Sequence, residues 1–217
     1  MRLFRRAKRV ESSGRSDPAD MNVPDNWHGG YYELSIKLGA ADDQRLDRAV
    51  TAMWSAAGFG AAFRRSTDQP WSWEPGTVSA SAVLEGHIGT LADVPGLGQC
   101  VCAVMVVREE RDQDGQTVLG ADWLDLCLPL GALSSLDPRV GGFPFGDASE
   151  SRAWREPIED WFSTIASAVF DQVPFAHAVT GNEVSGVELD EPEPGYVGLI
   201  HPDAATGAPL RTRIAHW

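Results

Sequence analysis

Two long alternating segments joined by a short polar turn constrain the fold more than any other feature of the sequence. Residues 99–110 and 117–129 are rich in β-branched and other apolar residues, a pattern typical of strands. The dipeptide Asp114-Gly115 lies between them and favours the tight turn of a β-hairpin. The sequence therefore predicts a long antiparallel hairpin near the middle of the chain.

Strand and helix patterns flank this hairpin. Residues 31–38 alternate apolar and polar side chains, which predicts a strand with one buried face. An amphipathic helix is predicted at 42–57, with Asp42 or Asp43 as its N-cap and Gly58 as its stop. Shorter or less regular strands are predicted at 77–91, 175–180, 196–200 and 211–216.

A second main helix is predicted at 151–173. Pro157 is tolerated only near a helix start, so we expect the regular part to begin near Glu156, and Pro174 to end it. The order of elements predicts an α+β fold, an antiparallel sheet with the two main helices packed on one face. An elaborated ferredoxin-like core is one version of this arrangement.

Composition divides the chain into two parts. Residues 1–30 are basic and then rich in Ser, Asp, Gly and Pro, which predicts a disordered lead before a single α+β domain at 31–217. Met21 as the true first residue is an alternative that the composition leaves open. Arginine far outnumbers lysine, and with abundant Ala and Gly this suggests a bacterial genome of high GC content.

The net charge of -13 is unevenly distributed. Residues 1–15 carry six basic residues and one acidic residue, a net of +5, whereas residues 16–217 carry 12 basic and 30 acidic residues, a net of -18. So acidic a body repels phosphate backbones, which argues against a nucleic-acid partner. Attraction to a basic protein or a cation is physically reasonable for such a body. The alternative is that the acidity serves solubility alone.

The sequence favours a cytoplasmic protein without a membrane partner. Leu3-Phe4 is followed at once by Arg5-Arg6, so the apolar region of a secretory signal is missing, and no segment is apolar enough for a membrane span. Three cysteines, an odd number without framework spacing, fit a reducing compartment. A hairpin centred on Asp114-Gly115 would place Cys102 opposite Cys127, with Cys100 on the same face, as small reduced core residues.

No linear catalytic, cofactor or metal motif is present. The sequence has no nucleophile elbow, phosphate-binding loop, dinucleotide fingerprint or paired metal-ligand spacing. His87 with Glu85 is the one acid–base candidate: on a strand the two side chains would share a face, and Glu85 could orient the imidazole. We therefore expect no cofactor, no metal and no identifiable catalytic residue.

Aromatic and acidic residues provide a candidate surface for a partner. Trp71, Trp73 and Glu74 lie in a region predicted as a loop, and Asp122 and Asp125 flank another tryptophan. Loop aromatics beside acids are suited to a protein interface. The alternative is that this loop folds back and caps the core.

Residues 31–38 (YYELSIKL) and 122–130 (DWLDLCLPL), together with the acidic body, resemble bacterial polymorphic-toxin immunity proteins. The resemblance is one of composition and layout over residues 30–217, and it assigns no functional residue. It implies a domain that binds a basic toxin and occludes it. The alternative from another class is an enzyme or small-ligand-binding domain, with Glu85, His87 and also Asp125 lining a pocket between the sheet and the helices.

Overall fold

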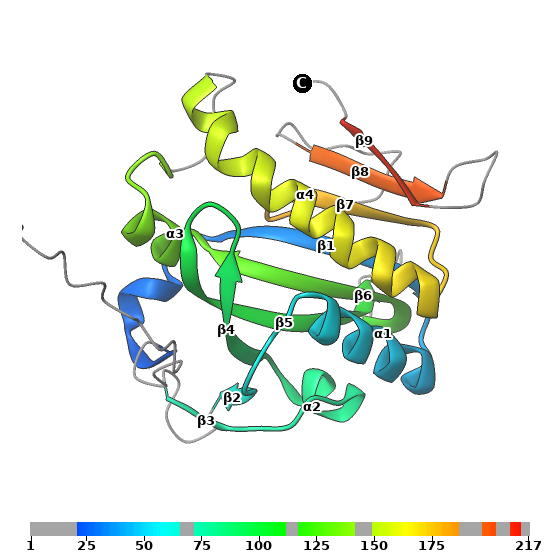
Figure 1. The fold of residues 1–217 in the computed structure, drawn as a ribbon. Coiled ribbons are helices and arrows are strands. Elements are labelled where there is room, and N and C mark those ends of the chain that lie inside the picture. Colours follow the sequence, from blue (N-terminus) through cyan, green and yellow to red (C-terminus); the bar gives the residue numbers. More distant parts are fainter. Residues whose placement is uncertain are drawn as a thin grey trace, which may run out of the picture.

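One antiparallel sheet organises the molecule. The computed structural model describes residues 21–65, 72–111, 117–141, 149–186, 197–202 and 209–213. Within these, nine strands follow the order β3-β2-β4-β5-β6-β1-β7-β8-β9 (Figure 1). They are β1 (Tyr31–Ala40), β2 (Phe63–Arg65), β3 (Trp73–Pro75), β4 (Ile88–Val94), β5 (Gly98–Arg111), β6 (Thr117–Pro129), β7 (His177–Asn182), β8 (Val197–Pro202) and β9 (Pro209–Arg213).

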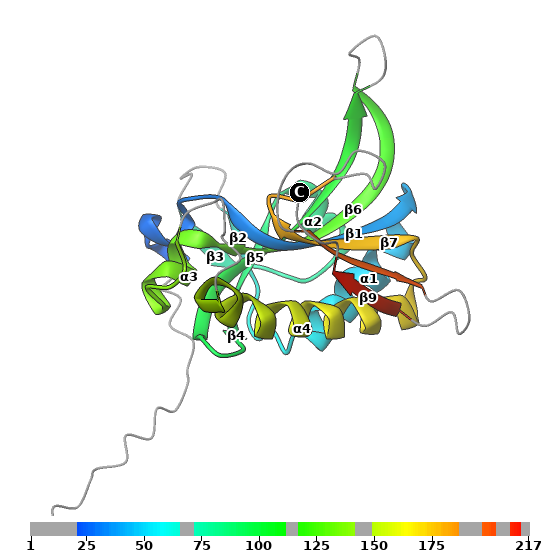
Figure 2. The ribbon, with the colours of Figure 1, turned by 90° about the horizontal axis from the view of Figure 1, so that it is seen from above.

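The helices are unequal in length. The two long ones are α1 (Asp43–Ala56) and α4 (Ser149–Gln172), which pack on each other over one face of the sheet (Figure 1 and Figure 2). The short elements are the 3-10 turn η2 (Pro24–Trp27) and the helices α2 (Ala80–Glu85) and α3 (Leu130–Leu136). The α+β class with an antiparallel sheet and two main helices on one face is therefore confirmed.

The core lies between the sheet and the two long helices. Tyr32 points from β1 toward α4, where its ring stacks on Phe162 at a centroid distance of 6.1 Å and meets Trp154 edge-on at 5.3 Å. Strand residues alternate between faces, so every second residue of β1, β5 and β6 joins this core. The predicted apolar faces of 31–38 and of both helices are buried as expected.

The four central strands have the order β5-β6-β1-β7, and helices α1 and α4 connect strands that follow each other in sequence but are not neighbours in the sheet. β1 leads through α1 to β4 and β5, and β6 pairs between β1 and β5, while α4 leads to β7 on the other side of β1. A ferredoxin-like core is one interpretation of this order. The sheet differs from such a core by the additional strands at both of its edges.

Two predicted elements differ from the structure. Residues 77–91 do not form one strand: Ser79 accepts a hydrogen bond from the backbone N–H of Ala82 and starts α2, and Gly86 follows its last residue before β4 begins. Helix α4 begins at Ser149 rather than near Glu156, so Pro157 lies inside it. The buried Trp154, which packs on Tyr32, holds the first turns of α4 against the sheet despite the proline.

The predicted boundary of the domain at residue 30 is too late. Met21 is fully buried, and Trp27 stacks on Trp73 with ring centroids 4.9 Å apart. Gly89 of β4 makes room for this contact, because a Cβ there would collide with Met21 Cε and would lie 2.6 Å from Trp73 Cζ3. Residues 21–30 therefore belong to the folded part of the chain, on the sheet face opposite α4, which we call the second face.

Candidate functional site

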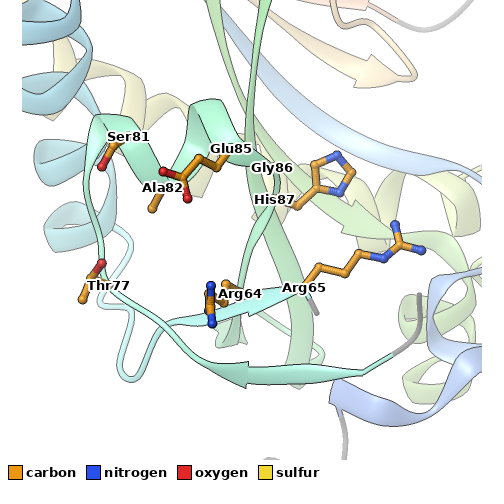
Figure 3. A pocket seen from close by; sticks show the side chains of 8 residues that line it. All are labelled: Arg64, Arg65, Thr77, Ser81, Ala82, Glu85, Gly86 and His87. Carbon is orange, nitrogen blue, oxygen red and sulfur yellow. The ribbon is translucent and has the colours of Figure 1, made fainter. Parts of the chain in front are cut away.

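A cavity of about 580 Å³ opens between β2, α2 and the start of β4 (Figure 3). We call it the β2–α2 cavity. Six of the eight residues that line it carry a polar side chain, although apolar and polar atoms contribute similarly to its surface: Arg64, Arg65, Thr77, Ser81, Ala82, Glu85, Gly86 and His87.

Local structure brings these side chains together. β2 pairs antiparallel with β4, and Arg64 is the register partner of Ile88. The same register places Arg65 across from His87, one residue before β4. Gly86 follows the last residue of α2, so only Gly86 and His87 separate the helix from the strand. From this short connection the Glu85 side chain points toward Ser81 and Thr77, while the His87 ring points the other way, beside Arg65 (Figure 3).

The charges of the cavity are mixed. Arg64 Nη2 lies 2.8 Å from Glu74 Oε1, in an ion pair whose side chains are both about half exposed. Burial lowers the pKa of His87, and the charge of Arg65 lowers it further. The imidazole is therefore neutral near pH 7, when it has one donor and one acceptor nitrogen. Glu85 is exposed and faces the cavity (Figure 3).

Glu85 and His87, the pocket residues predicted from the sequence, both line this cavity, but their side chains point apart (Figure 3). They do not share the face of a strand, because Glu85 is the last residue of a helix and His87 lies in a connection. Asp125 does not line this cavity; it lies on β6, with β5 and β4 between it and β2.

A second polar group lies on the second face, at β1 and β6. We call it the carboxylate cluster: Glu33, Ser35, Asp125, Cys127 and Ser185. Glu33 is the register partner of Cys127, and Ser35 is the partner of Asp125. Glu33 and Asp125 are 3% and 0% exposed. Two carboxyl groups are thus enclosed beside each other.

Both carboxyl groups of this cluster accept hydrogen bonds from neighbouring residues. Asp125 accepts the hydroxyl groups of Ser35 and Ser185, each at an oxygen–oxygen distance of 2.5 Å. Glu33 accepts the thiol of Cys127 at 3.3 Å and the backbone N–H of Ser185 at 3.4 Å. Ser185 lies just after β7, so the two carboxyl groups tie the start of the β7–β8 connection to the middle of the sheet.

Enclosure changes the protonation of both acids. Burial, together with the neighbouring charge of Asp125, raises the pKa of Glu33 to about 7. Burial likewise raises the pKa of Asp125 to about 6, against the opposing effect of its two serine hydrogen bonds. Near neutral pH the pair therefore titrates between one bound proton and none.

The residues predicted to form a partner surface do not lie together on an exposed surface. Trp73 is 9% exposed and packs on Trp27, as the core-capping alternative expected. Asp122 is fully buried and accepts hydrogen bonds from Arg108, while Asp125 belongs to the carboxylate cluster. Glu74 is half exposed, and Trp71 lies outside the described residues.

The predicted cysteine pairing is also wrong. Cys127 is opposite Ala103 rather than Cys102. The register already differs by one residue at Arg111, which is opposite Thr117, and it shifts again between Val107 and Glu109. A shift of one residue turns a side chain to the other face, so Cys102 faces the helices and Cys127 faces the carboxylate cluster. All three cysteines are buried free thiols, as predicted.

Sequence reasoning missed Arg64 and Arg65 at the cavity and Glu33 in the cluster. The adjacent arginines in a strongly acidic body were a usable signal. Glu33 gave none, because a polar residue in an alternating strand is normally solvent-facing. In the fold, backbone N–H groups of Val184 and Ser185, after β7, donate hydrogen bonds to its carboxylate.

Comparisons with protein-family models, with curated proteins and with solved structures found no match. Within the described ranges, no three or more His, Cys, Asp or Glu side chains are grouped so as to hold a metal ion. A search of the same ranges found no helix with the length and hydropathy needed to cross a membrane.

Proposed function

We propose that the chain is a protein-binding domain that recognises a basic partner through the outer surface of α1 and α4. The specific form of this proposal is an immunity protein that occludes a cationic toxin. One observation carries it: both helices present carboxylates along their exposed sides, next to a shallow groove that small side chains line.

The exposed positions follow helical spacing. On α1, Asp43 and Asp47 occupy the first exposed turns, and on α4 the acids lie at Glu156, Asp160 and Asp171. Residues three or four apart lie on one side of a helix, so these acids form an acidic stripe on each helix. On α4 the exposed Arg152 leaves the stripe with excess negative charge, whereas on α1 Asp43 is paired with Arg108 and Arg48 follows Asp47. The excess negative charge of this surface therefore lies on α4.

The groove between the helices is a second argument that this surface binds a protein. It has a volume of about 450 Å³ and its walls come from both helices. Small side chains form most of it, together with two charged groups and one amide: Asp47, Arg48, Thr51, Ala52, Ser55, Ala56, Ala168 and Gln172. Such a groove admits side chains of a partner, while the acids beside it steer and orient a basic surface.

This surface replaces the one predicted from the sequence. The tryptophans do not provide exposed anchors in the described residues, since Trp54, Trp73, Trp123 and Trp154 are all buried and Trp27 and Trp161 are half-buried. Acidic side chains therefore contribute mainly to the rate of encounter, and the groove contributes the apolar contact.

The test is affinity capture followed by a comparison of matched variants. The partner sought is a basic protein retained at low ionic strength, with the product of any adjacent toxin-like gene tested first in co-expression. Asp160→Asn/Asp171→Asn removes two negative charges from α4. We expect its association rate constant to fall several-fold at low salt, with a smaller difference at high salt.

The matched control is Asp25→Asn/Asp93→Asn, which changes the net charge equally but at exposed positions away from both helices. Its association rate should remain close to that of the wild type. Equal effects of the two double variants would show that only net charge matters. No captured basic partner, together with no protection from a co-expressed toxin, would overturn the proposal.

A further inference from the structure

We propose that residues 183–186, which follow β7, form a latch that protons control: it stays closed over Glu33 and Asp125 while the pair holds a proton, and it opens when both acids are ionised. We call these residues the latch turn. The device uses no residue of α1 or α4, so it goes beyond the proposed function. The two proposals can therefore fail separately.

The contacts of the two carboxyl groups are the first argument. Two of their hydrogen-bond donors, Ser35 and Cys127, lie in the strands β1 and β6. Ser185 of the latch turn donates its hydroxyl group to Asp125 and its backbone N–H to Glu33. The strand that leads into the latch turn, β7, neighbours β1 on the side away from β6 (Figure 1). The backbone ladder fixes β1 and β6, whereas the latch turn can move without breaking that ladder.

The backbone of the latch turn provides a hinge. Glu183 has a φ of 50°, and among the described residues it is the only one other than glycine with a positive φ. Its N–H donates to the backbone oxygen of Tyr31 at 3.0 Å, where the pairing of β7 with β1 ends. Gly186, at the other end of the turn, has a φ of 72°. A side chain in the left-handed region is strained and is held there by surrounding contacts, so opening the latch turn lets Glu183 relax.

The surroundings of the pair favour its protonated form. Met105 of β5, opposite Asp125, is uncharged. Lys37 lies further along the same face of β1, with its Nζ 5.3 Å from the ring centroid of Trp123. Burial outweighs the hydrogen bonds and the attraction of Lys37, because the pKa of both acids is raised. The titratable side chains around the pair, on the described parts of β1, β6, β7 and the latch turn, are Tyr31, Lys37, Cys127, His177 and Glu183, with Arg65 of β2 beyond Tyr31.

Protonation decides whether the closed state is stable. With one proton bound, the pair carries a single negative charge, and the hydroxyl groups of Ser35 and Ser185 stabilise such a charge at Asp125. Loss of this proton leaves two charges beside each other in an enclosed site, where carboxylates lack the hydration they have in water. The pKa of Glu33 is raised to about 7, so this occurs as the pH rises above neutrality. Moving the latch turn admits water to both carboxylates, because Ser185 contacts both.

The experiment is a measurement of ¹⁵N relaxation at the backbone amides of the full chain, at a series of pH values from about 5.5 to about 8.5. We expect the order parameter of Ser185 to be about 0.85 at the lowest pH and to fall below about 0.6 at the highest. The midpoint should lie near the pKa of Glu33, about 7. The order parameter of Ile36, which pairs with both neighbouring strands in β1, should stay at about 0.85, because the sheet remains folded.

Variants identify the groups that control the latch. Glu33→Gln leaves one ionisable acid in the pair, so Ser185 should stay ordered over the whole pH range. Asp125→Asn should have the same effect and is the second variant if the first does not fold. Glu85→Gln removes an exposed carboxylate outside the cluster, so it is the matched control and should open as the wild type does. The amide spectrum of each variant shows directly whether it is folded.

Three outcomes would overturn the proposal. An order parameter of Ser185 that is the same at both ends of the pH range in the wild type would show, without any variant, that the latch does not open. A loss of order in a folded Glu33→Gln or Asp125→Asn variant equal to that of the wild type would show that the acid pair does not control it. A parallel loss of order at Ile36 would show that the sheet unfolds together with the turn.

Discussion

Glu33 and Asp125 lie on the neighbouring strands β1 and β6, both enclosed on the second face, and the charge of Asp125 adds to the effect of burial on the pKa of Glu33. Both carboxyl groups accept hydrogen bonds from Ser185. Within the described residues, the two carboxyl groups accept hydrogen bonds from hydroxyl, thiol and backbone N–H donors. Protons, rather than an ion pair, therefore make this burial tolerable.

The first prediction concerns the dependence of stability on pH. The folded-state pKa of Glu33 is raised from 4.5 to about 7, and that of Asp125 from 3.8 to about 6. The folded state thus binds more protons than the unfolded state, so stability decreases as the pH rises from about 4 to 7. For Glu33 the contribution is roughly 3 kcal/mol.

Urea unfolding across this range, in the wild type and in Glu33→Gln, measures the contribution. The quantity to compare is the difference between the two proteins in the free energy of unfolding at each pH. Burial lowers the pKa of His87, which makes stability increase with pH in both proteins, and this effect cancels in the difference. We expect the free energy of unfolding of the variant to decrease much less above pH 5 than that of the wild type. Parallel curves would contradict a raised pKa at Glu33.

The second prediction concerns a buried ion pair at the start of α1. Arg108 donates to both oxygens of Asp122, at 2.6 and 3.1 Å, and the backbone N–H of Asp42 donates to the same carboxylate at 3.1 Å. Asp122→Ala leaves a largely enclosed guanidinium without this partner. We expect a loss of about 3 kcal/mol in the free energy of unfolding, measured in urea.

Asp43→Ala is the comparison for this pair. Asp43 also bonds to Arg108, at 2.6 Å, but its side chain is 72% exposed. Removing it should lower the free energy of unfolding by less than about 1 kcal/mol. Similar losses in the two variants would show that burial does not determine the strength of these contacts.

The third prediction concerns the contact of residues 21–30 with the sheet. Gly89→Ala places a methyl group against Met21 and the indole of Trp73. We expect destabilisation by about 1–3 kcal/mol and a change in tryptophan fluorescence, because Trp73 must move. Gly60→Ala is the control, since a Cβ at Gly60 meets nothing within 4 Å. An unchanged spectrum in Gly89→Ala would place Trp73 elsewhere.

The fourth prediction concerns the thiols. Burial raises the pKa of Cys100 to about 12 and holds those of Cys102 and Cys127 well above the ordinary thiol value. The thiolate is the reactive form, so all three should react with a disulfide reagent at least about tenfold more slowly in the folded protein than in urea. Rapid labelling of the folded chain would contradict their enclosure.

The sequence predicts what depends on local pattern. β1, β5, β6 and α1 agree with their predicted segments, because alternation and helical spacing survive packing. The register of the hairpin was not predictable, because the shift between Val107 and Glu109 leaves no mark in the sequence. Helix α2 was missed because its apolar residues Ala80 and Val83 span less than two turns.

The candidate sites depend on contacts between distant segments. Glu85 and His87 both line one cavity, as predicted, but the two arginines that also line it come from a strand about twenty residues earlier. The burial of Asp122 and Asp125 follows from Arg108 and Ser185, which lie 14 and 60 residues away. An acid beside a tryptophan in the sequence therefore did not indicate an exposed acid in the fold.

One edge of the sheet ends in β3, a strand of three residues from Trp73 to Pro75. Proline has no amide hydrogen, so the outermost residue of this strand cannot donate to an added one. Another chain approaching this edge would find too few free donors to extend the sheet. The molecule is thus protected on this side against growing into a fibril, even though nine strands would otherwise offer a broad template.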